Sequence, residues 1–134
     1  GGIYCENANP FIKDCIIQNN LANEGGGAGI FCFESSPTFR GCIITGNVTD
    51  DVGGGLYARD GSSPSFFDCT FFDNLAEFGG GCYLKSTSNP LMENVSFTQN
   101  TANNSGGGIG LKDNANILGT NLTISENIDV EKSS

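Results

Sequence analysis

Short runs of alternating apolar and polar residues return at a fixed interval along this chain of 134 residues. One complete unit occupies residues 53–74 (GGGLYARDGSSPSFFDCTFFDN), with a glycine triplet, an alternating run, a Ser-Pro turn, a second alternating run and an asparagine. The turn position is held in turn by Pro10, Pro37, Pro64, Pro90 and Ile117, and ten residues later stand Asn20, Asn47, Asn74, Asn100 and Asn127. A period of 26 or 27 residues is typical of a stacked repeat protein.

The period-two alternation predicts strands with one inward and one outward face. The inward positions of the first run are Ile3 and Cys5, Ile30 and Cys32, Leu56 and Ala58, Cys82 and Leu84, and Ile109 and Leu111. Those of the second run are Cys15 and Ile17, Cys42 and Ile44, Cys69 and Phe71, Val95 and Phe97, and Leu122 and Ile124. Twenty glycines and the lack of a helical apolar stripe argue against helices.

We therefore predict an all-β parallel β-helix, a solenoid in which equivalent residues stack roughly 4.8 Å apart. Its single domain comprises about five coils, at residues 1–24, 25–52, 53–78, 79–105 and 106–134. The glycines are expected at a tight corner, and the asparagines should form a ladder of side-chain amides. We recognise no capping segment at either end, so the domain is expected to be a segment of a longer solenoid or to meet other copies of itself.

Two motifs carry a family resemblance. The Gly-Gly-x-aliphatic corner, combined with Phe-x-x-Asn at residues 71–74 and 97–100, resembles the repeats of the chlamydial polymorphic outer-membrane proteins. Residues 26–28 match that family's usual Gly-Gly-Ala corner, while Ile17, Ile44 and Ile124 replace the phenylalanine in the other coils. The resemblance implies a right-handed, pectin-lyase-like β-helix used in adhesion or as a surface spacer.

Composition narrows the partners and the location. The formal net charge of −9 argues against nucleic acid and against an anionic membrane surface. No apolar run is long enough to cross a bilayer, so we expect no membrane insertion. Six cysteines and four Asn-x-Ser/Thr sites point to a secreted protein, extracellular or at the cell surface.

The cysteines fall into inward columns, with Cys5 above Cys32 and Cys15 above Cys42. Stacking at coil spacing satisfies the Cα separation of a disulfide, so we predict these two pairs and a third between Cys69 and Cys82. The alternative is a stack of reduced thiols that pack as small apolar side chains. Because the chain has no histidine and no C-x-x-C, we expect no metal site, and we regard Asp50 and Asp51 as solvated loop acids rather than calcium ligands.

Asn94 and Asn121 occupy one outward position in adjacent coils, and each begins an Asn-x-Ser/Thr site. We predict N-linked glycans there and at Asn103, in a loop before a glycine corner. Asn47 also begins such a site, but it belongs to the inward asparagine column and is the weakest candidate. Apart from these glycans no cofactor is expected.

The outward face of the first run is the candidate ligand or lateral-contact face. It carries an aromatic column and, in coils three to five, a basic column: Tyr4, Phe31, Tyr57 and Tyr83, then Arg59, Lys85 and Lys112. Aromatic rings beside cations suit a surface polysaccharide or a neighbouring protein. The same column also fits a purely structural aromatic ladder that stiffens the sheet.

We expect no catalytic residues. Polysaccharide lyases and hydrolases of this fold use clustered carboxylates beside a base, and no outward aspartate column here adjoins an arginine or lysine. The sequence instead favours a structural solenoid, a rod segment of a surface adhesin or a subunit of a glycosylated extracellular fibril that assembles end to end with copies of itself. The alternative is a carbohydrate-binding or polysaccharide-cleaving β-helix.

Overall fold

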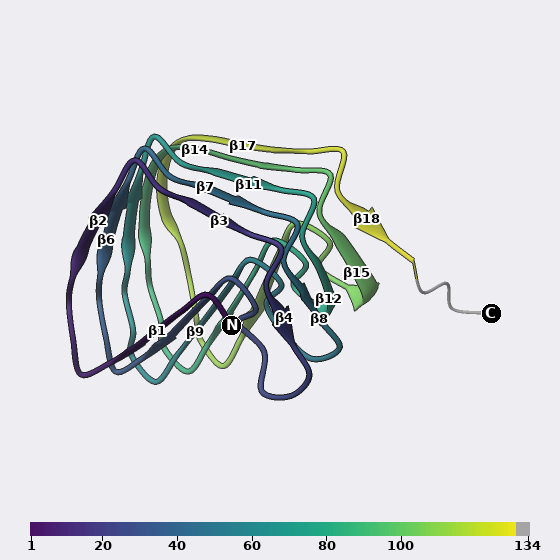
Figure 1. Cartoon of the computed structure of the whole chain (residues 1–134), viewed down its shortest axis with the longest axis horizontal. Helices are drawn as coiled ribbons and strands as arrows, with labels where there is room; N and C mark the ends of the chain where they lie inside the picture. Colours follow the sequence, from purple (N-terminus) through teal and green to yellow (C-terminus); the bar gives the residue numbers. More distant parts are fainter. Residues whose placement is uncertain (131–134) are drawn as a thin grey trace.

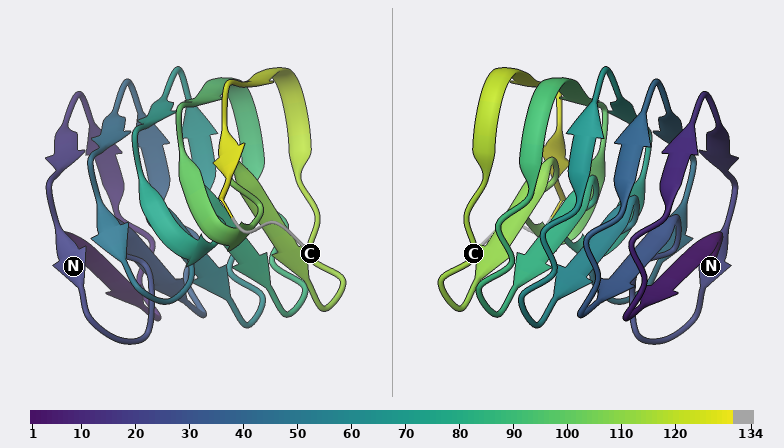
Figure 2. Two further views of the ribbon diagram at one scale, coloured as in Figure 1. Left: turned by 90° about the vertical axis from the view of Figure 1, so that its right-hand side faces the viewer. Right: turned by 90° about the vertical axis from the view of Figure 1, so that its left-hand side faces the viewer.

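The computed structural model describes residues 1–130, which form a solenoid of parallel strands without any helix. Three sheets run along the solenoid, and each coil contributes to all three (Figure 1). Figure 2 shows the coils side by side in chain order, from the purple first coil to the yellow-green last one. All the strand pairs are parallel and join equivalent residues of adjacent coils. The predicted all-β solenoid of about five coils is therefore confirmed.

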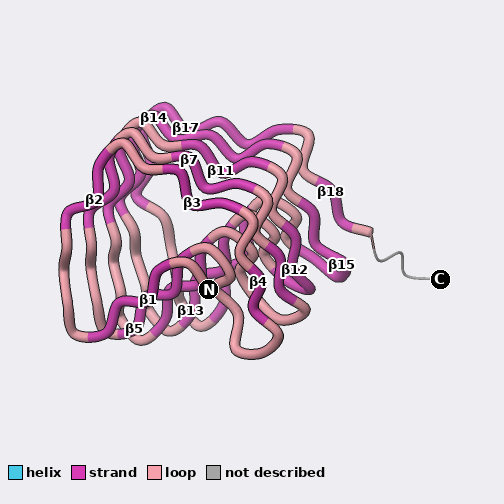
Figure 3. The backbone as a smooth tube through the Cα atoms, in the orientation of Figure 1, coloured by secondary structure: helices cyan, strands magenta, loops and turns pink. Residues whose placement is uncertain are grey.

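Sheet A contains β1 (Ile3–Glu6), β5 (Ile30–Phe33), β9 (Leu56–Arg59), β13 (Cys82–Lys85) and β16 (Ile109–Lys112). Sheet C contains β4 (Leu21–Ala22), β8 (Val48–Thr49), β12 (Leu75–Phe78), β15 (Thr101–Ser105) and β18 (Ile128–Asp129). Turns and loops join the sheets at the corners of each coil (Figure 3).

Sheet B bends into two arms. One arm holds β2 (Phe11–Lys13), β6 (Thr38–Arg40) and β10 (Ser65–Phe67), and the other holds β3 (Ile16–Gln18), β7 (Ile43–Thr45) and β11 (Thr70–Phe72). In the last two coils β14 (Leu91–Thr98) and β17 (Leu118–Ser125) extend across both arms.

The interior consists of columns of like side chains. Phe39 and Phe66 stack with ring centroids 4.9 Å apart and planes 7° apart, and Phe71 and Phe97 stack at 4.5 Å and 8°. All four rings are fully buried. In the last described coil the same inward positions are open to solvent: Leu111 is 50% exposed and Ile124 is 52% exposed. The predicted assignment of inward-facing residues is thus confirmed. In the last described coil some of these residues are exposed.

The asparagine column is a continuous amide ladder, as predicted. The Oδ1 atom of Asn74 accepts hydrogen bonds from the backbone N–H and the Nδ2 of Asn47, both at 3.0 Å. Its Nδ2 donates to the carbonyl of Ile44 and to Oδ1 of Asn100, both at 2.9 Å. The same pattern links the column from Asn20 to Asn127. Every polar atom of a central amide is therefore satisfied although the side chain is buried.

The glycine corner packs against this ladder. Gly53, Gly79 and Gly106 have positive φ angles of 69°, 66° and 74°, which L side chains rarely adopt. Gly81 has an ordinary φ, but a Cβ there would lie 2.4 Å from the carbonyl oxygen of Gly108 and 3.1 Å from Nδ2 of Asn100. Glycine is required at one position for its backbone angle and at the other for close approach, as the sequence indicated.

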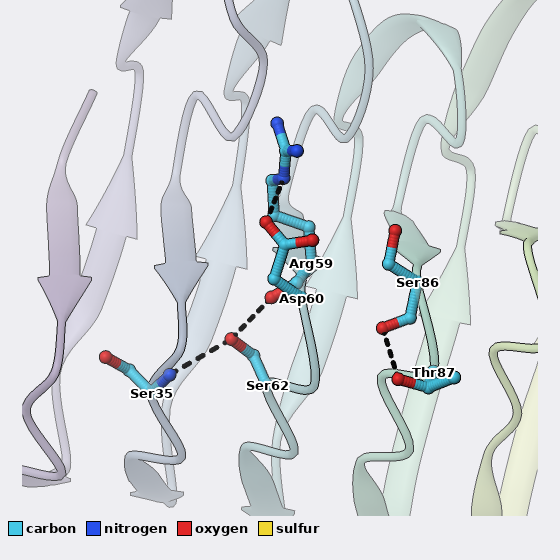
Figure 4. Close-up of polar contacts among 6 residues, drawn as sticks. All are labelled: Ser35, Arg59, Asp60, Ser62, Ser86 and Thr87. Carbon is cyan, nitrogen blue, oxygen red and sulfur yellow. Dashed lines mark hydrogen bonds and ion pairs between the residues drawn. The ribbon is translucent and has the colours of Figure 1, made fainter.

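Buried serines form a second ladder on the opposite corner. The hydroxyl of Ser62 accepts from the backbone N–H of Ser35 at 3.1 Å and donates to the carbonyl of Arg59 at 2.8 Å (Figure 4). The equivalent hydroxyl of Ser88 is fully buried and has no hydrogen-bond partner among the described residues. The N–H of Ser62, which the pattern would direct to Ser88, donates to Arg59 instead. The ladder is therefore interrupted between coils three and four.

The asparagine ladder predicts a large effect of a small substitution. Asn74→Ala would leave the groups of two neighbouring coils unpaired, so we expect the free energy of unfolding to fall by about 3 kcal/mol or more. Urea denaturation followed by circular dichroism measures this. Asn103→Ala, at an exposed position on β15, is the control and should change stability by less than about 0.5 kcal/mol. Equal effects of the two substitutions would contradict the ladder's role.

The interrupted serine ladder predicts opposite outcomes for two buried serines. Ser62→Ala should lower the free energy of unfolding by about 1–3 kcal/mol, because it leaves the Ser35 N–H unpaired and removes one of the two hydrogen bonds that the Arg59 carbonyl accepts. Ser88→Ala removes a buried hydroxyl without a partner, so stability should stay level or rise by about 1 kcal/mol. The same denaturation curves compare the two variants, and a large loss at Ser88 would show that its hydroxyl has a partner.

Candidate functional site

The outward face of sheet A carries the predicted aromatic column. The ring centroids of Tyr4 and Phe31 are 5.3 Å apart, those of Phe31 and Tyr57 are 5.0 Å apart, and those of Tyr57 and Tyr83 are 5.8 Å apart. Gly110 continues the register, and Tyr83 would meet any Cβ placed there at 2.8 Å. The four rings therefore form one continuous ladder, which ends where the glycine lies.

The corner loops between sheets C and A rise beside this ladder and form a groove. Its volume is about 500 Å³, and its lining residues come from coils two to five: Gly25, Asp51, Val52, Tyr57, Arg59, Phe78, Tyr83, Lys85 and Lys112. A second groove of about 380 Å³ lies over the first two coils and includes Tyr4, Leu21, Glu24 and Phe31. The predicted face is thus divided, and only Tyr57 and Tyr83 of its aromatic residues lie with the three cations.

The cations differ in how they are held. Nε of Arg59 lies 2.8 Å from Oδ2 of Asp60, and its guanidinium stands 5.7 Å from the ring centroid of Phe33 (Figure 4). Lys85 and Lys112 are Cα partners on β13 and β16, and neither forms an ion pair within residues 1–130. Asp60 therefore screens the arginine, whereas the two lysines have no ion-pair partner in the described part of the chain.

Two tyrosine hydroxyls complete the groove. Tyr57 is 6% exposed and Tyr83 is half-buried. Burial raises the pKa of both phenols, so both remain protonated hydrogen-bond donors at neutral pH. Asp51, on the opposite wall, accepts a hydrogen bond from the N–H of Gly25 at 3.1 Å. The groove therefore offers cations and neutral donors, with one carboxylate at its edge.

Sequence reasoning did not find Asp51, Val52 or Phe78 as groove residues. These residues lie at the end of sheet C, one corner away from the tyrosines along the chain. The only available signal was their position directly before the glycines of the corner. Because that corner turns the chain back onto sheet A, residues on its approach become the wall of the groove.

All six cysteines are free thiols, so the structure contains none of the predicted disulfides. Cys5 and Cys32 are Cα partners, but in-register strands hold equivalent Cβ atoms roughly 4.8 Å apart, and a disulfide needs about 3.5–4.5 Å. Cys69 and Cys82 are not brought together. Cys69 lies on sheet B's corner above Val95, and Cys82 pairs with Leu56 and Ile109 in sheet A.

Burial keeps several of the thiols protonated. It raises the pKa of Cys32 and Cys82 far above that of an ordinary cysteine and raises that of Cys69 to about 11. Five of the six cysteines are buried, and Cys15 is exposed. The cysteine columns thus pack as small apolar side chains, which was the alternative interpretation.

The candidate glycosylation sites occupy different environments. Asn94 and Asn121 are exposed at a corner of sheet B with φ angles of 55° and 51°. Nδ2 of Asn121 donates to Oδ1 of Asn94 at 2.8 Å, and Nδ2 of Asn94 donates to Asp68 at 2.7 Å. Asn103 is exposed on β15, whereas Asn47 is fully buried in the amide ladder. Only Asn103 is therefore both exposed and outside these ladders.

Other chemistry finds little support in the described part of the chain. Asp50 and Asp51 are exposed, and no group of three or more Cys, Asp or Glu residues within residues 1–130 is placed to hold a metal ion. None of these residues forms a helix long and apolar enough to cross a membrane.

Comparison with known proteins yields one match. The protein-family model described as "Right handed beta helix region" matches residues 1–131. No curated protein and no solved structure matches the chain significantly, and the resemblance to chlamydial polymorphic outer-membrane proteins is not shown by any of the comparisons.

The thiol environments predict selective reactivity. At about pH 8 one thiol per chain, Cys15, should react with DTNB in the native protein, because the other five thiols are buried. All six should react after denaturation without a reductant. Cys15→Ser is the matched control and should remove the native reaction. Fewer than six thiols in the denatured protein would show that disulfides form after all.

Proposed function

Because the chain belongs to the family of right-handed β-helix regions, we propose that it serves as a structural rod that extends by axial stacking. In this role it is a segment of an extracellular adhesin or a subunit of a glycosylated fibril, and copies of the chain meet end to end. One observation carries the proposal. The coils stack in a regular register: the strand pairs join equivalent residues of adjacent coils, and the inward apolar columns are fully buried between the coils, as at Leu84 and Phe97.

The contacts inside the stack supply the template for such a joint. Each coil pairs with the next through three parallel sheets, as β13 pairs with β16, β14 with β17 and β15 with β18, so one kind of contact repeats along the whole described stack. The asparagine column reaches both end coils, at Asn20 and Asn127. A second copy that continued the register would extend both arrays. An unpaired sheet edge readily pairs with another chain.

The side groove does not favour catalysis. Its lining contains one carboxylate, Asp51, whereas glycoside hydrolysis uses a pair of carboxyl groups at a defined separation. The coils also repeat without a long inserted loop, since their lengths stay near 26–27 residues. Uniform coils support a rod more directly than they support a catalytic cleft.

The glycan part of the proposal rests on Asn103. Its side chain is exposed in the middle of β15 and takes no part in the amide ladders. A glycan attached there would lie on the side of the rod and would leave the axial joint uncovered.

Electron microscopy of the undenatured chain tests the proposal. We expect filaments with an axial repeat of roughly 24 Å, five coils at sheet spacing, or a multiple of it. Ile124→Asp should abolish them, because it places a charge on the apolar end face. Ser125→Asp, on the same strand but facing outward, is the matched control and should leave them intact. Dispersed particles of the unmodified chain at every concentration would contradict the end-to-end model.

A further inference from the structure

The groove beside Tyr57 and Tyr83 gathers cations on an acidic protein. Three cations and one carboxylate line it, in a chain whose net charge is −9. After burial, the nearby carboxylates Asp60 and Asp113 contribute to the raised pKa values of Tyr57 and Tyr83, respectively. Arg59 is already paired with Asp60, but Lys85 and Lys112 lie on adjacent strands without an ion-pair partner in the described residues. Two parallel lysines at coil spacing, roughly 4.8 Å, can both reach the oxygens of one compact anion.

We propose that this groove binds a doubly charged oxyanion carried on a small organic group, as in a phosphate or sulfate monoester. Lys85 and Lys112 contact the oxyanion, and the hydroxyls of Tyr57 and Tyr83 donate hydrogen bonds to it or to the group that carries it. The site goes beyond the proposed rod function, because it lies on the side of the solenoid and does not depend on axial joints.

Size supports an ester rather than a bare ion. The groove's volume of about 500 Å³ lies within the range of small-molecule pockets, roughly 300–1,000 Å³. A water molecule accounts for about 30 Å³ of liquid, so a five-atom oxyanion would leave most of the groove empty. The wall formed by Val52 and Phe78 offers apolar surface to the remainder of the ligand.

The surroundings disfavour an extended polyanion. Along the same face, coil one carries Glu6, whose Oε1 accepts a hydrogen bond from the hydroxyl of Tyr4, and Glu24 lines the neighbouring groove. A chain of repeated negative charges running along the solenoid would meet these carboxylates after leaving the lysines. A compact dianion confined to coils three to five avoids them.

Isothermal titration calorimetry at about 20 mM salt, where surface charges are weakly screened, tests the site. The ligands are glucose 6-phosphate and glucose 6-sulfate, with inorganic phosphate and sulfate as bare ions, glucuronate as a monoanion and glucose as a neutral control. We expect saturable binding of at least one ester, about tenfold or more tighter than glucuronate and glucose. The two esters are separated by pH: phosphate has a second pKa of about 6, so its binding should weaken between about pH 7.5 and 5.5, whereas sulfate binding should not.

Variants assign the binding to the groove. Lys85→Gln combined with Lys112→Gln should weaken the ester by about tenfold or more, because two charge-assisted contacts are lost. Tyr57→Phe combined with Tyr83→Phe keeps the rings and should cost a smaller factor. Lys13→Gln, an exposed lysine on β2, is the matched control and should change the affinity by less than about twofold.

Two results would overturn the proposal. One is no saturable binding of either ester up to about 10 mM, beyond the range of even a weak site. The other is an equal loss of affinity in Lys13→Gln and in the double lysine variant, which would mean non-specific attraction. Tighter binding of glucuronate than of either ester would also reject the dianion and would favour an acidic sugar instead. None of these results bears on filament formation, so the rod proposal is judged separately.

Discussion

The structure depends on each buried polar side chain meeting its own equivalent in the next coil. An asparagine amide carries both a donor and an acceptor, so a column of identical asparagines satisfies itself without water. Asn74 does this with Asn47 on one side and Asn100 on the other. A different side chain in the column would leave groups in two coils unpaired, at a cost of about 1–3 kcal/mol each. This requirement holds the coil path constant and explains why the period varies by only one residue.

Many of the acidic residues occupy the turns between the strands of each coil. Within residues 1–130, fifteen non-glycine residues have positive φ angles, and seven of them are acidic: Asp14, Glu34, Asp60, Asp68, Asp73, Asp113 and Glu126. Asparagine and aspartate tolerate this conformation better than other L residues. Since these seven are nearly half of the fifteen Asp and Glu residues, the net charge of −9 is partly a consequence of turning the chain. It is weaker evidence about partners than the composition alone suggested.

The sequence was sufficient wherever a feature repeats. Inward columns, the asparagine ladder, the glycine corner and the aromatic column could all be predicted, because identical residues at one period must stack. It failed where the answer depends on side-chain direction or on a loop's path. Stacked cysteines such as Cys5 and Cys32 satisfy the Cα spacing of a disulfide but point the same way. Asn94 and Asn121 match glycosylation sites, yet their left-handed backbone is itself a sufficient reason for asparagine.

Residues that the fold requires repeat at the same position in every coil. A position whose residue type changes from coil to coil is therefore not fixed by the fold. The outward column after the aromatic ladder changes character along the stack, from Glu6 and Phe33 to Arg59, Lys85 and Lys112. The fold does not require a cation at this position, because Glu6 and Phe33 occupy it in the first two coils. A stretch of three cations in an acidic chain is therefore not explained by stacking. The proposed ligand site on the side of the solenoid would account for these cations, whereas the proposed axial joint needs nothing beyond the repeat itself.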